Sequence, residues 1–314
     1  FKQKTAYEIM PSLVGSEMCI RDRYGTWLKA NSLNIEDLPD ITTTTSKSKD
    51  LNALQKTFGY TLEDMQIILD PMALNGSEPI GSMGNDTPLA VLSDKTQLMF
   101  NYFKQLFAQV SNPPLDAIRE ELVTSLESFI GSEQNLFEET PEHCKQLRLH
   151  QPILTNDELN KIKHMPDNLM KVSTCSTLFD TTSGSGSLEI AVKQLCDDAS
   201  DAVDAGNTII ILSDLGVNDR FAPIPGLLAT SAVHHHLIRQ GKRTKVGLVV
   251  ESGEPREVMH FALLIGYGAG AINPYLALDT LDENISDGTL LGAVDVYTGQ
   301  KNFIKAIGLS LIHI

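Results

Sequence analysis

The sequence predicts an α/β fold in which a helical N-terminal part is followed by βα units. Two short apolar runs, at 208–212 (TIIIL) and 246–250 (VGLVV), are typical of strands buried inside a parallel sheet. A third strand is expected at 269–272. Each run is followed by a proline and a helical pattern, and the units recur at intervals of about thirty residues. This repeat predicts crossover connections in a parallel sheet or barrel.

Composition indicates an ordinary globular protein. The 314 residues are 42% hydrophobic and 21% charged, so one or two domains with a large core are expected. The net charge of -15 opposes binding to phosphate backbones, and no nucleic acid is expected as a partner. Four cysteines, Cys19, Cys144, Cys175 and Cys196, form no CxxC pair. We therefore expect no disulfide framework or metal site, and a reducing compartment: the cytoplasm or a plastid stroma.

The two ends of the chain differ from the rest. Residues 10–23 (MPSLVGSEMCIRDR) and 309–314 (LSLIHI) resemble translated sequencing-library adaptor. We therefore expect residues 1–23 and 309–314 to be artefacts, and the domain to cover 24–308. The first stretch also lacks the apolar core and cleavage site of a signal peptide, so export is not expected.

The pattern from Tyr24 to about Pro166 is mainly helical. One helix is expected to bury a stripe made of Met99, Phe103, Leu106, Phe107 and Val110. Its aromatic residues could form a flavin or base platform, but a core role is favoured. Asn112-Pro113-Pro114 should end this helix, and Asp116 should cap a second one that runs through Phe129 to Gly131.

Two polar stretches interrupt the chain. Residues 42–50 (TTTTSKSKD) predict a loop. Residues 180–187 (DTTSGSGS) match no phosphate-loop pattern and predict a linker or a channel-lining loop. This second stretch divides the expected domain into a mainly helical part, 24–187, and a βα-repeat part, 188–308.

The uncharged stretch 261–278 is not expected to span a membrane. Gly266, Gly268 and Gly270, followed by Asn273-Pro274, break it into a helix end, a short strand and a new helix start. No membrane partner is therefore expected.

Polar residues follow each predicted strand: Ser213-Asp214, Glu251-Ser252 and Asn273. Sites in parallel α/β folds form at this edge of the sheet. The alternative, that these side chains cap helices and bind water, is favoured.

His234-His235-His236 invites a metal interpretation. Consecutive helical residues diverge by about 100°, so three in a row cannot converge on one ion. His236 shares the predicted buried face of its helix, and we expect it to be a packed, hydrogen-bonded histidine.

The sequence contains no Cys/His or Ser/His pattern typical of a nucleophile. We expect no catalytic residue, no bound cofactor and no metal in this chain.

Several long stretches resemble one family, the glutamate synthases, in their central domain. They are 68–93 (ILDPMALNGSEPIGSMGNDTPLAVLS), 100–131 (FNYFKQLFAQVSNPPLDAIREELVTSLESFIG), 152–159 (PILTNDEL) and most of 210–278, including APIPGLLATSAVHHHLIRQGKRTKVGLVVESGEPREVMHF. Leu215 and Met259 depart from the residues common in the family.

The resemblance implies a degenerate TIM-barrel-like domain, a flavin-type barrel lacking flavin. It implies a parent enzyme that converts glutamine, 2-oxoglutarate and a reductant into two glutamates, using FMN and a 3Fe-4S cluster. Within the parent, this region would connect an N-terminal glutaminase domain to a C-terminal FMN domain and form an ammonia channel. Ferredoxin or a nicotinamide-oxidising small subunit would supply the electrons.

The residues expected to line the channel are Gly81, Ser82, Gly84, Asn85 and Thr87, together with Asp180 and Thr181. Glycines let the backbone approach closely, and small polar groups can exchange hydrogen bonds with a neutral amine. A plain glycine turn is the alternative interpretation of the loop.

The sequence is also compatible with two other functions. A stand-alone flavin- or phosphate-binding barrel enzyme would need a basic or glycine-rich cradle at the strand ends, and an absorbance spectrum would reveal it. A non-enzymatic interaction module would be revealed by a reading frame that does not continue into flavin-domain sequence.

Overall fold

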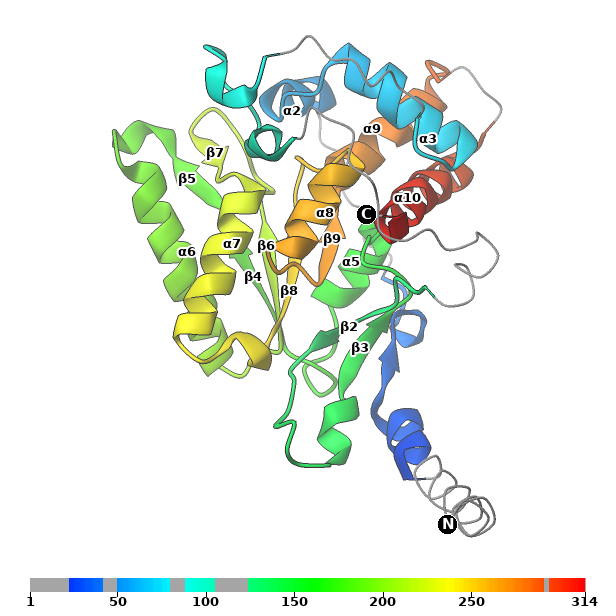
Figure 1. Ribbon diagram of the computed structural model, residues 1–314, viewed down its shortest axis with the longest axis vertical. Coiled ribbons are helices and arrows are strands. Elements are labelled where there is room, and N and C mark those ends of the chain that lie inside the picture. The colour runs from blue at the N-terminus through cyan, green and yellow to red at the C-terminus, as the bar shows by residue number, and fades with distance from the viewer. Residues whose placement is uncertain (1–22, 42–49, 80–87, 105–123, 291–293, 314) are drawn as a thin grey trace, which may run out of the picture.

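The main element of the computed structural model is a four-stranded parallel sheet (Figure 1). The structure describes residues 23–41, 50–79, 88–104, 124–290 and 294–313. The strand order is β4-β6-β8-β9. The strands are β4 (Val172–Ser176), β6 (Ile209–Ser213), β8 (Gly247–Glu251) and β9 (Ala271–Asn273). The three strands predicted from apolar runs are confirmed, because residues buried on both faces of a sheet need no polar alternation.

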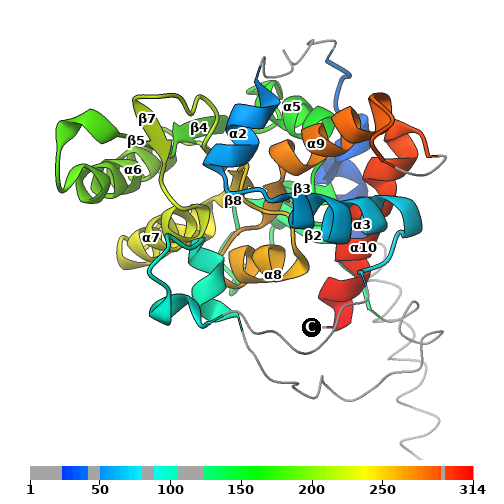
Figure 2. The ribbon, with the colours of Figure 1, turned by 90° about the horizontal axis from the view of Figure 1, so that it is seen from above.

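Helices follow the strands and cover one face of the sheet. They are α6 (Ser187–Asp204), α7 (Gly226–Arg239) and α8 (Val258–Gly266). Ile210, Leu212 and Leu248 pack in one core with α6 and α7. Ile209, Ile211, Val249 and Ala271 alternate with them and pack on the opposite face, against α5 (Asn156–Lys163). Figure 2 shows the sheet between these layers.

A second, three-stranded sheet covers the same face as α5. It comprises β1 (Leu33–Asn34), β2 (Ser128–Gly131) and β3 (Gln146–Leu149), in the order β1-β3-β2. The prediction that a helix runs through Phe129 to Gly131 is wrong, because these residues lie on β2 and Phe129 pairs with Arg148. Strand alternation leaves Phe129 48% exposed and buries Ile130 against the main sheet. Residues 105–123, with the rest of the predicted helices, lie outside the described residues.

The segment that was expected to bury Met99 and Phe103 on one helix face buries a different side chain. Met99–Phe103 form a 3₁₀ helix, and Phe100 is buried while Phe103 is 40% exposed. The tighter 3₁₀ turn rotates successive side chains by a different angle from an α-helix, which explains the error. Phe100 stacks on His260 with ring centroids 4.3 Å apart, so the core interpretation of the aromatic residues is correct for this ring.

The described part of the main sheet is open, and no closed barrel is found there. Beyond β9, Ile153 forms one parallel bridge to Ile272. β4 precedes the break at 180–187 yet pairs along its length with β6. The boundary expected at 187 therefore runs through the sheet, and the part before it contains strands as well as helices.

A further group of helices gathers beside β9 and over the carboxyl ends of the strands (Figures 1 and 2). Phe261, Leu276, Phe303 and Met72 share one core there. The elements are α2 (Leu51–Thr57), a π-helix (Asp64–Leu69), α3 (Asp70–Asn75), α9 (Tyr275–Ser286) and α10 (Val296–His313). The predicted break of 261–278 into helix, strand and helix is confirmed. None of the helices in the described ranges is long and apolar enough to cross a membrane.

The histidine run holds two loops together. His234, rather than the predicted His236, makes the internal hydrogen bond: its Nδ1 accepts from Arg243 Nε at 2.9 Å. Arg243 also donates to the carbonyl of Gly268 at 2.9 Å, which ties the loop after α7 to the loop after α8. His236 is only partly buried. No group of metal-ligating side chains occurs within the described residues.

Gly268 should be essential to this arrangement. Its φ is +113°, and a Cβ atom there would lie 2.2 Å from His234 Nδ1. Gly268→Ala should lower the free energy of unfolding by about 2–4 kcal/mol, because a left-handed backbone and a steric clash both oppose it. Urea denaturation measures this.

Gly266 provides the matched control. It has ordinary φ and no atom within 4 Å of an added Cβ. Gly266→Ala should leave stability unchanged or raise it by up to about 1 kcal/mol. Equal destabilisation by both substitutions would contradict this account of Gly268.

Candidate functional site

The polar residues that follow the strands meet at one edge of the sheet. We call the ends of β6, β8 and β9 the carboxyl edge; its polar side chains are Ser213, Asp214, Glu251, Ser252 and Asn273, and all are buried. The favoured expectation that they cap helices is wrong. The residues before α7, α8 and α9 are Pro225, Glu257 and Pro274, and none makes a side-chain cap. The edge residues instead bond to one another and to neighbouring segments.

Asp214 is the centre of the edge network. Ser252 Oγ donates to its carboxylate at 2.6 Å, and the Gly253 amide donates at 3.1 Å. The Tyr275 hydroxyl also hydrogen-bonds to it. Burial raises the pKa of Asp214 to about 7, and the hydrogen bonds from Ser252 and Tyr275 oppose that rise. This carboxyl group therefore titrates near neutral pH.

Glu254 connects the edge to α7. Its Oε2 accepts from the amide of Gly226, the first residue of that helix, at 2.7 Å. A carboxylate is favoured at a helix N-terminus, where free amides point outward. Burial nevertheless raises the pKa of Glu254.

Arg256 is the principal cation of the network, and its side chain is 4% exposed. Nε and Nη2 reach Asp64 at 3.1 and 3.0 Å. Nη1 donates to the carbonyls of Phe58 and Glu254, and Nη2 to that of Gly59. The guanidinium therefore donates four hydrogen bonds, and its Nη2 also forms an ion pair with Asp64.

Two aromatic rings complete the contact between Arg256 and the segment after α2. The guanidinium carbon lies 4.3 Å from the centre of the Tyr60 ring, and Tyr60 donates to the Gly253 carbonyl at 3.0 Å. Phe58 packs directly on Gly253, where an added Cβ would lie 2.7 Å from the ring. The segment after α2 is thus fixed to the carboxyl edge.

A second buried ion pair lies on the α5 side of the edge. Lys163 Nζ donates to both oxygens of Glu251, at 2.6 and 2.7 Å. Both groups are largely withdrawn from water, so separating them would leave an unpaired buried charge. Lys163 is therefore held in place and is not available to bind an anion.

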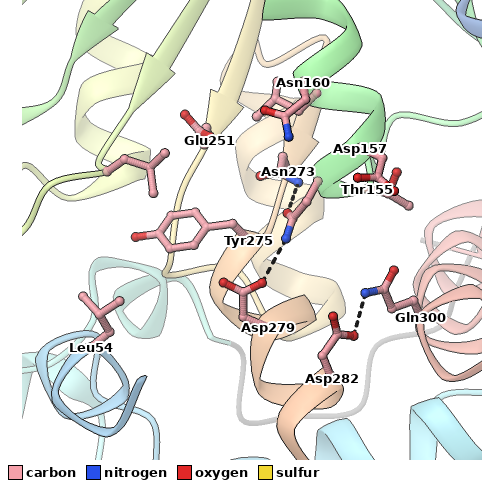
Figure 3. A pocket seen from close by; sticks show the side chains of 13 residues that line it. Leu54, Thr155, Asp157, Asn160, Glu251, Asn273, Tyr275, Asp279, Asp282 and Gln300 are labelled. Atoms are coloured by element: carbon pink, nitrogen blue, oxygen red, sulfur yellow. Dashed lines mark hydrogen bonds between the residues drawn. The ribbon is translucent and has the colours of Figure 1, made fainter. Parts of the chain in front are cut away.

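A pocket of about 480 Å³ lies beside these groups, and we call it the edge pocket (Figure 3). It lies among the carboxyl edge, α2, α5, α9 and α10. Its polar lining includes four carboxylates, Asp157, Glu251, Asp279 and Asp282. The remaining lining residues are Leu54, Thr155, Asn156, Leu159, Asn160, Leu215, Asn273, Tyr275 and Gln300.

A chain of amides fixes the pocket wall. Asn273 Nδ2 donates to Leu154 O at 3.0 Å and to Asn156 Oδ1 at 2.9 Å. Asn156 Nδ2 in turn donates to Asp279 Oδ1 at 3.0 Å, and Gln300 Nε2 donates to Asp282 Oδ1 at 2.7 Å. Figure 3 shows both carboxylates of α9 on this side of the helix.

The edge does not fit a flavin phosphate. A phosphate needs free amides or cations, whereas the edge is lined by Asp214, Glu251 and Glu254, and its cations Lys163 and Arg256 already hold carboxylates. The N-terminus of α5 is also closed, because Thr155 and Glu158 form a capping box there.

The structure separates two of the predicted channel residues, Asp180 and Thr181, from the edge pocket. Asp180 and Thr181 lie at the β5–β7 ribbon, β5 being Leu178–Asp180 and β7 Phe221–Pro223, and neither lines the pocket. Arg220 binds Asp180 at 2.7 Å and holds its carboxyl pKa well below the usual range. Thr181 donates to the Arg220 carbonyl. Gly81, Ser82, Gly84, Asn85 and Thr87 lie outside the described residues.

Sequence reasoning identified the edge residues but missed their partners. Arg256, Lys163 and Tyr275 contact groups far away in the chain, and no local spacing predicts such contacts. Asp279 and Asp282 stand three residues apart on α9, a spacing that places two carboxylates on one helix face. That spacing was the available signal for the pocket.

Comparison with known proteins gives one consistent family. A model of the glutamate synthase central domain matches residues 53–314. The chain is 47% identical to the glutamate synthase [NADPH] large chain of Bacillus subtilis, over 85% of this chain and 17% of that protein. It is 42% identical to the glutamate synthase [NADH] of Schizosaccharomyces pombe, over 82% of this chain and 12% of that protein.

A plant relative covers more of this chain. The chain is 39% identical to ferredoxin-dependent glutamate synthase 1, chloroplastic/mitochondrial, of Arabidopsis thaliana, over 93% of this chain and 18% of that protein. It thus spans less than a fifth of the length of each of these three relatives.

The raised pKa of Asp214 predicts a specific pH dependence of stability. Its folded-state pKa of about 7 lies above the ordinary value of 3.8, so its contribution is fully present below pH 4 and is lost as pH rises through 7. Between pH 5 and 8 the wild type should therefore lose stability relative to Asp214→Asn, which cannot ionise. Glu254 contributes with the same sign in both proteins.

Urea denaturation at several pH values measures the difference between the two curves. Asp201→Asn, on the exposed face of α6, is the matched control and should run parallel to the wild type. Parallel curves for Asp214→Asn and the wild type over this range would show that Asp214 titrates normally.

Proposed function

We propose, because this chain belongs to the glutamate synthase central domain family, that it is the domain-connecting region of a glutamate synthase and forms part of its ammonia channel. The family match, which runs from residue 53 to 314, is the observation that carries this proposal. The proposed reaction converts glutamine, 2-oxoglutarate and two electrons with two protons into two glutamates, in ammonia assimilation.

The work proposed for this region is positioning and water exclusion. Ammonia released into water at neutral pH becomes ammonium, which has no free electron pair to attack a carbonyl group. A protein wall between the glutaminase site and the site of reduction keeps ammonia neutral and near its acceptor. The proposal assigns no bond-making step to this chain.

The fold proposed for the whole region is a degenerate TIM barrel. Two features of the main sheet support it: its strands follow one another in chain order, and α6 and α7 lie on the same face. Doubly wound sheets place helices on both faces, whereas barrel-type winding places them on one. Ile153 extends the series by a bridge beyond β9.

FMN and the 3Fe-4S cluster are proposed to belong to other parts of the parent polypeptide. The carboxylates of the carboxyl edge disfavour a flavin phosphate there, which supports this assignment. The names of the relatives mention NADPH, NADH and ferredoxin. We propose that ferredoxin or a nicotinamide-oxidising subunit delivers electrons outside this region, in the cytoplasm or a plastid stroma.

The proposed partners are the glutaminase domain and the FMN domain of the same parent. Exposed apolar side chains support such contacts. Leu89, Val91, Leu92, Tyr102 and Phe103 lie exposed on one stretch of the chain, and Phe137 is 98% exposed. Several large apolar side chains exposed on one short stretch of chain are typical of a contact surface.

A chimera tests the proposed function. Residues 53–308 of this chain would replace the matched segment of the Bacillus subtilis large chain. The chimera should form two glutamates for each glutamine consumed, with NADPH oxidised in step. A folded chimera with normal flavin content that hydrolyses glutamine but forms no glutamate from 2-oxoglutarate would contradict the proposal.

The same chimera tests the channel residues. We propose that the loop of Gly81, Ser82, Gly84, Asn85 and Thr87 lines the ammonia path, with Asp180 and Thr181 contributing polar groups. Thr87→Phe should leave glutamine hydrolysis intact but release ammonia, so that the glutamate formed per glutamine falls toward one. Thr289→Phe, at an exposed position, is the control. Unchanged coupling in Thr87→Phe would remove this loop from the path.

A further inference from the structure

We propose that the turn formed by residues 135–138, which we call the tip turn, inserts Leu136 and Phe137 into an apolar pocket of another domain of the parent polypeptide. Basic side chains surround that pocket. The inference rests on the proposed function, which supplies the parent, and it adds the residues of this chain that make the contact. The connection between β2 and β3, which contains the tip turn, projects from the end of the molecule opposite to α2 (Figure 1). It therefore lies far from the carboxyl edge.

The first observation is the exposure of two neighbouring apolar side chains. Leu136 is 86% exposed and Phe137 is 98% exposed, the two largest values among the large hydrophobic side chains of the described residues. Burying a leucine and an aromatic ring releases a large apolar area from water. Aromatic side chains that fill a partner's pocket are typical anchors of protein interfaces.

The second observation is that the backbone does not require these residues. The amide of Glu138 donates to the carbonyl of Asn135 at 3.0 Å, so residues 135–138 form a hydrogen-bonded β-turn. Its two central positions usually hold glycine, proline, asparagine, aspartate or serine. Here they hold Leu136 and Phe137, and neither has a positive φ. Turn formation therefore leaves the choice of these side chains unexplained, whereas docking explains it.

The third observation is that the tip turn is fixed before any partner binds. Asn135 Oδ1 accepts from the Phe137 amide at 3.2 Å, and Asn135 Nδ2 donates to Glu138 Oε1 at 3.1 Å. The carbonyl of Glu138 accepts from His143 Nε2 at 2.6 Å. At the base of the connection, the Glu133 amide donates to the Thr244 carbonyl at 2.7 Å. An ordered turn loses less conformational entropy on binding than a free loop does.

The fourth observation is the charge around the tip turn. Four exposed glutamates lie within residues 132–145, against a single lysine, Lys145; they are Glu133, Glu138, Glu139 and Glu142. Glu139 binds Arg23 in a pair that is more than half exposed and is therefore weak. None of the ion pairs within the described ranges includes the other three glutamates. A partner surface with basic side chains around its pocket complements this charge.

The charge also distinguishes between two sources of that surface. A second copy of this chain, which carries a net charge of -15, would bring the same glutamates against one another if two tip turns met. The chain spans 17% of the Bacillus subtilis large chain, so more than four fifths of a parent of that length lies outside it. The parent's other domains are therefore the source to which we assign the pocket.

Protease protection tests the docking. Glutamyl endopeptidase cuts after glutamate, and Glu138 and Glu139 follow the two apolar side chains directly. Cleavage at these two bonds should be at least tenfold slower in the chimera described above than in the 314-residue chain. Phe137→Ser should restore at least tenfold faster cleavage in the chimera. In the 314-residue chain the same substitution should leave the rate unchanged, because the ring there has no contact to lose.

Ile190→Ser is the matched control. Ile190 is a 72% exposed apolar side chain on α6, away from the tip turn, and its substitution should leave the protection of the chimera unchanged. A photoreactive benzoylphenylalanine at position 137 identifies the partner. It should cross-link to a segment of the same polypeptide outside residues 53–308, and the same group at position 190 should not.

Four results would overturn the proposal: equal cleavage in the chimera and the 314-residue chain, equal loss of protection in Phe137→Ser and Ile190→Ser, no cross-link from position 137, or a cross-link only to a second copy or to residues 53–308. The proposed function has a separate readout, the glutamate formed per glutamine. A chimera that couples normally without protection contradicts only the docking, and a protected chimera that forms no glutamate contradicts only the proposed function.

Discussion

Arg256 places a permanent positive charge where water does not reach, and it donates four hydrogen bonds to acceptors supplied by the protein. Three of those acceptors, on Phe58, Gly59 and Asp64, come from a segment almost two hundred residues earlier in the chain. A buried guanidinium without partners would cost several kcal/mol. The structure can therefore bury this charge only by fixing the segment after α2 to the carboxyl edge.

The same requirement shapes the rest of the edge. Asp214 and Glu254 are buried acids, and they are tolerated because Ser252, Tyr275 and the start of α7 donate to them. Glu251 is held by Lys163 from α5. These bonds use the available cations internally, which leaves the adjoining pocket lined by carboxylates. The edge thus acts as a rigid frame, and this suits a region proposed to position other domains rather than to perform a reaction.

The sequence could predict what depends on neighbouring residues. The runs TIIIL and VGLVV became strands because their residues are buried on both faces, and polar residues at their ends did gather at one edge. Phe129, Phe103 and His236 were misplaced because strand pairing, a 3₁₀ turn and Arg243 decided their surroundings. The bonds of Arg256 and Lys163 join distant segments, which no periodicity reveals. The expected boundary at 187 was placed at a change in composition. The strand β4, which precedes it, pairs with β6, which follows it.

The central claim is that Arg256 fixes the segment after α2 to the carboxyl edge. Hydrogen exchange of Arg256→Lys, compared with the wild type, tests it most directly, because lysine keeps the charge but supplies only three donors. Amides of residues 54–60, such as those of Phe58 and Tyr60, which bond to Leu54 and Gln55, should exchange at least about tenfold faster. Amides of β6 and β8 should keep their protection. Unchanged exchange at 54–60, or equal loss of protection in the sheet, would contradict the account.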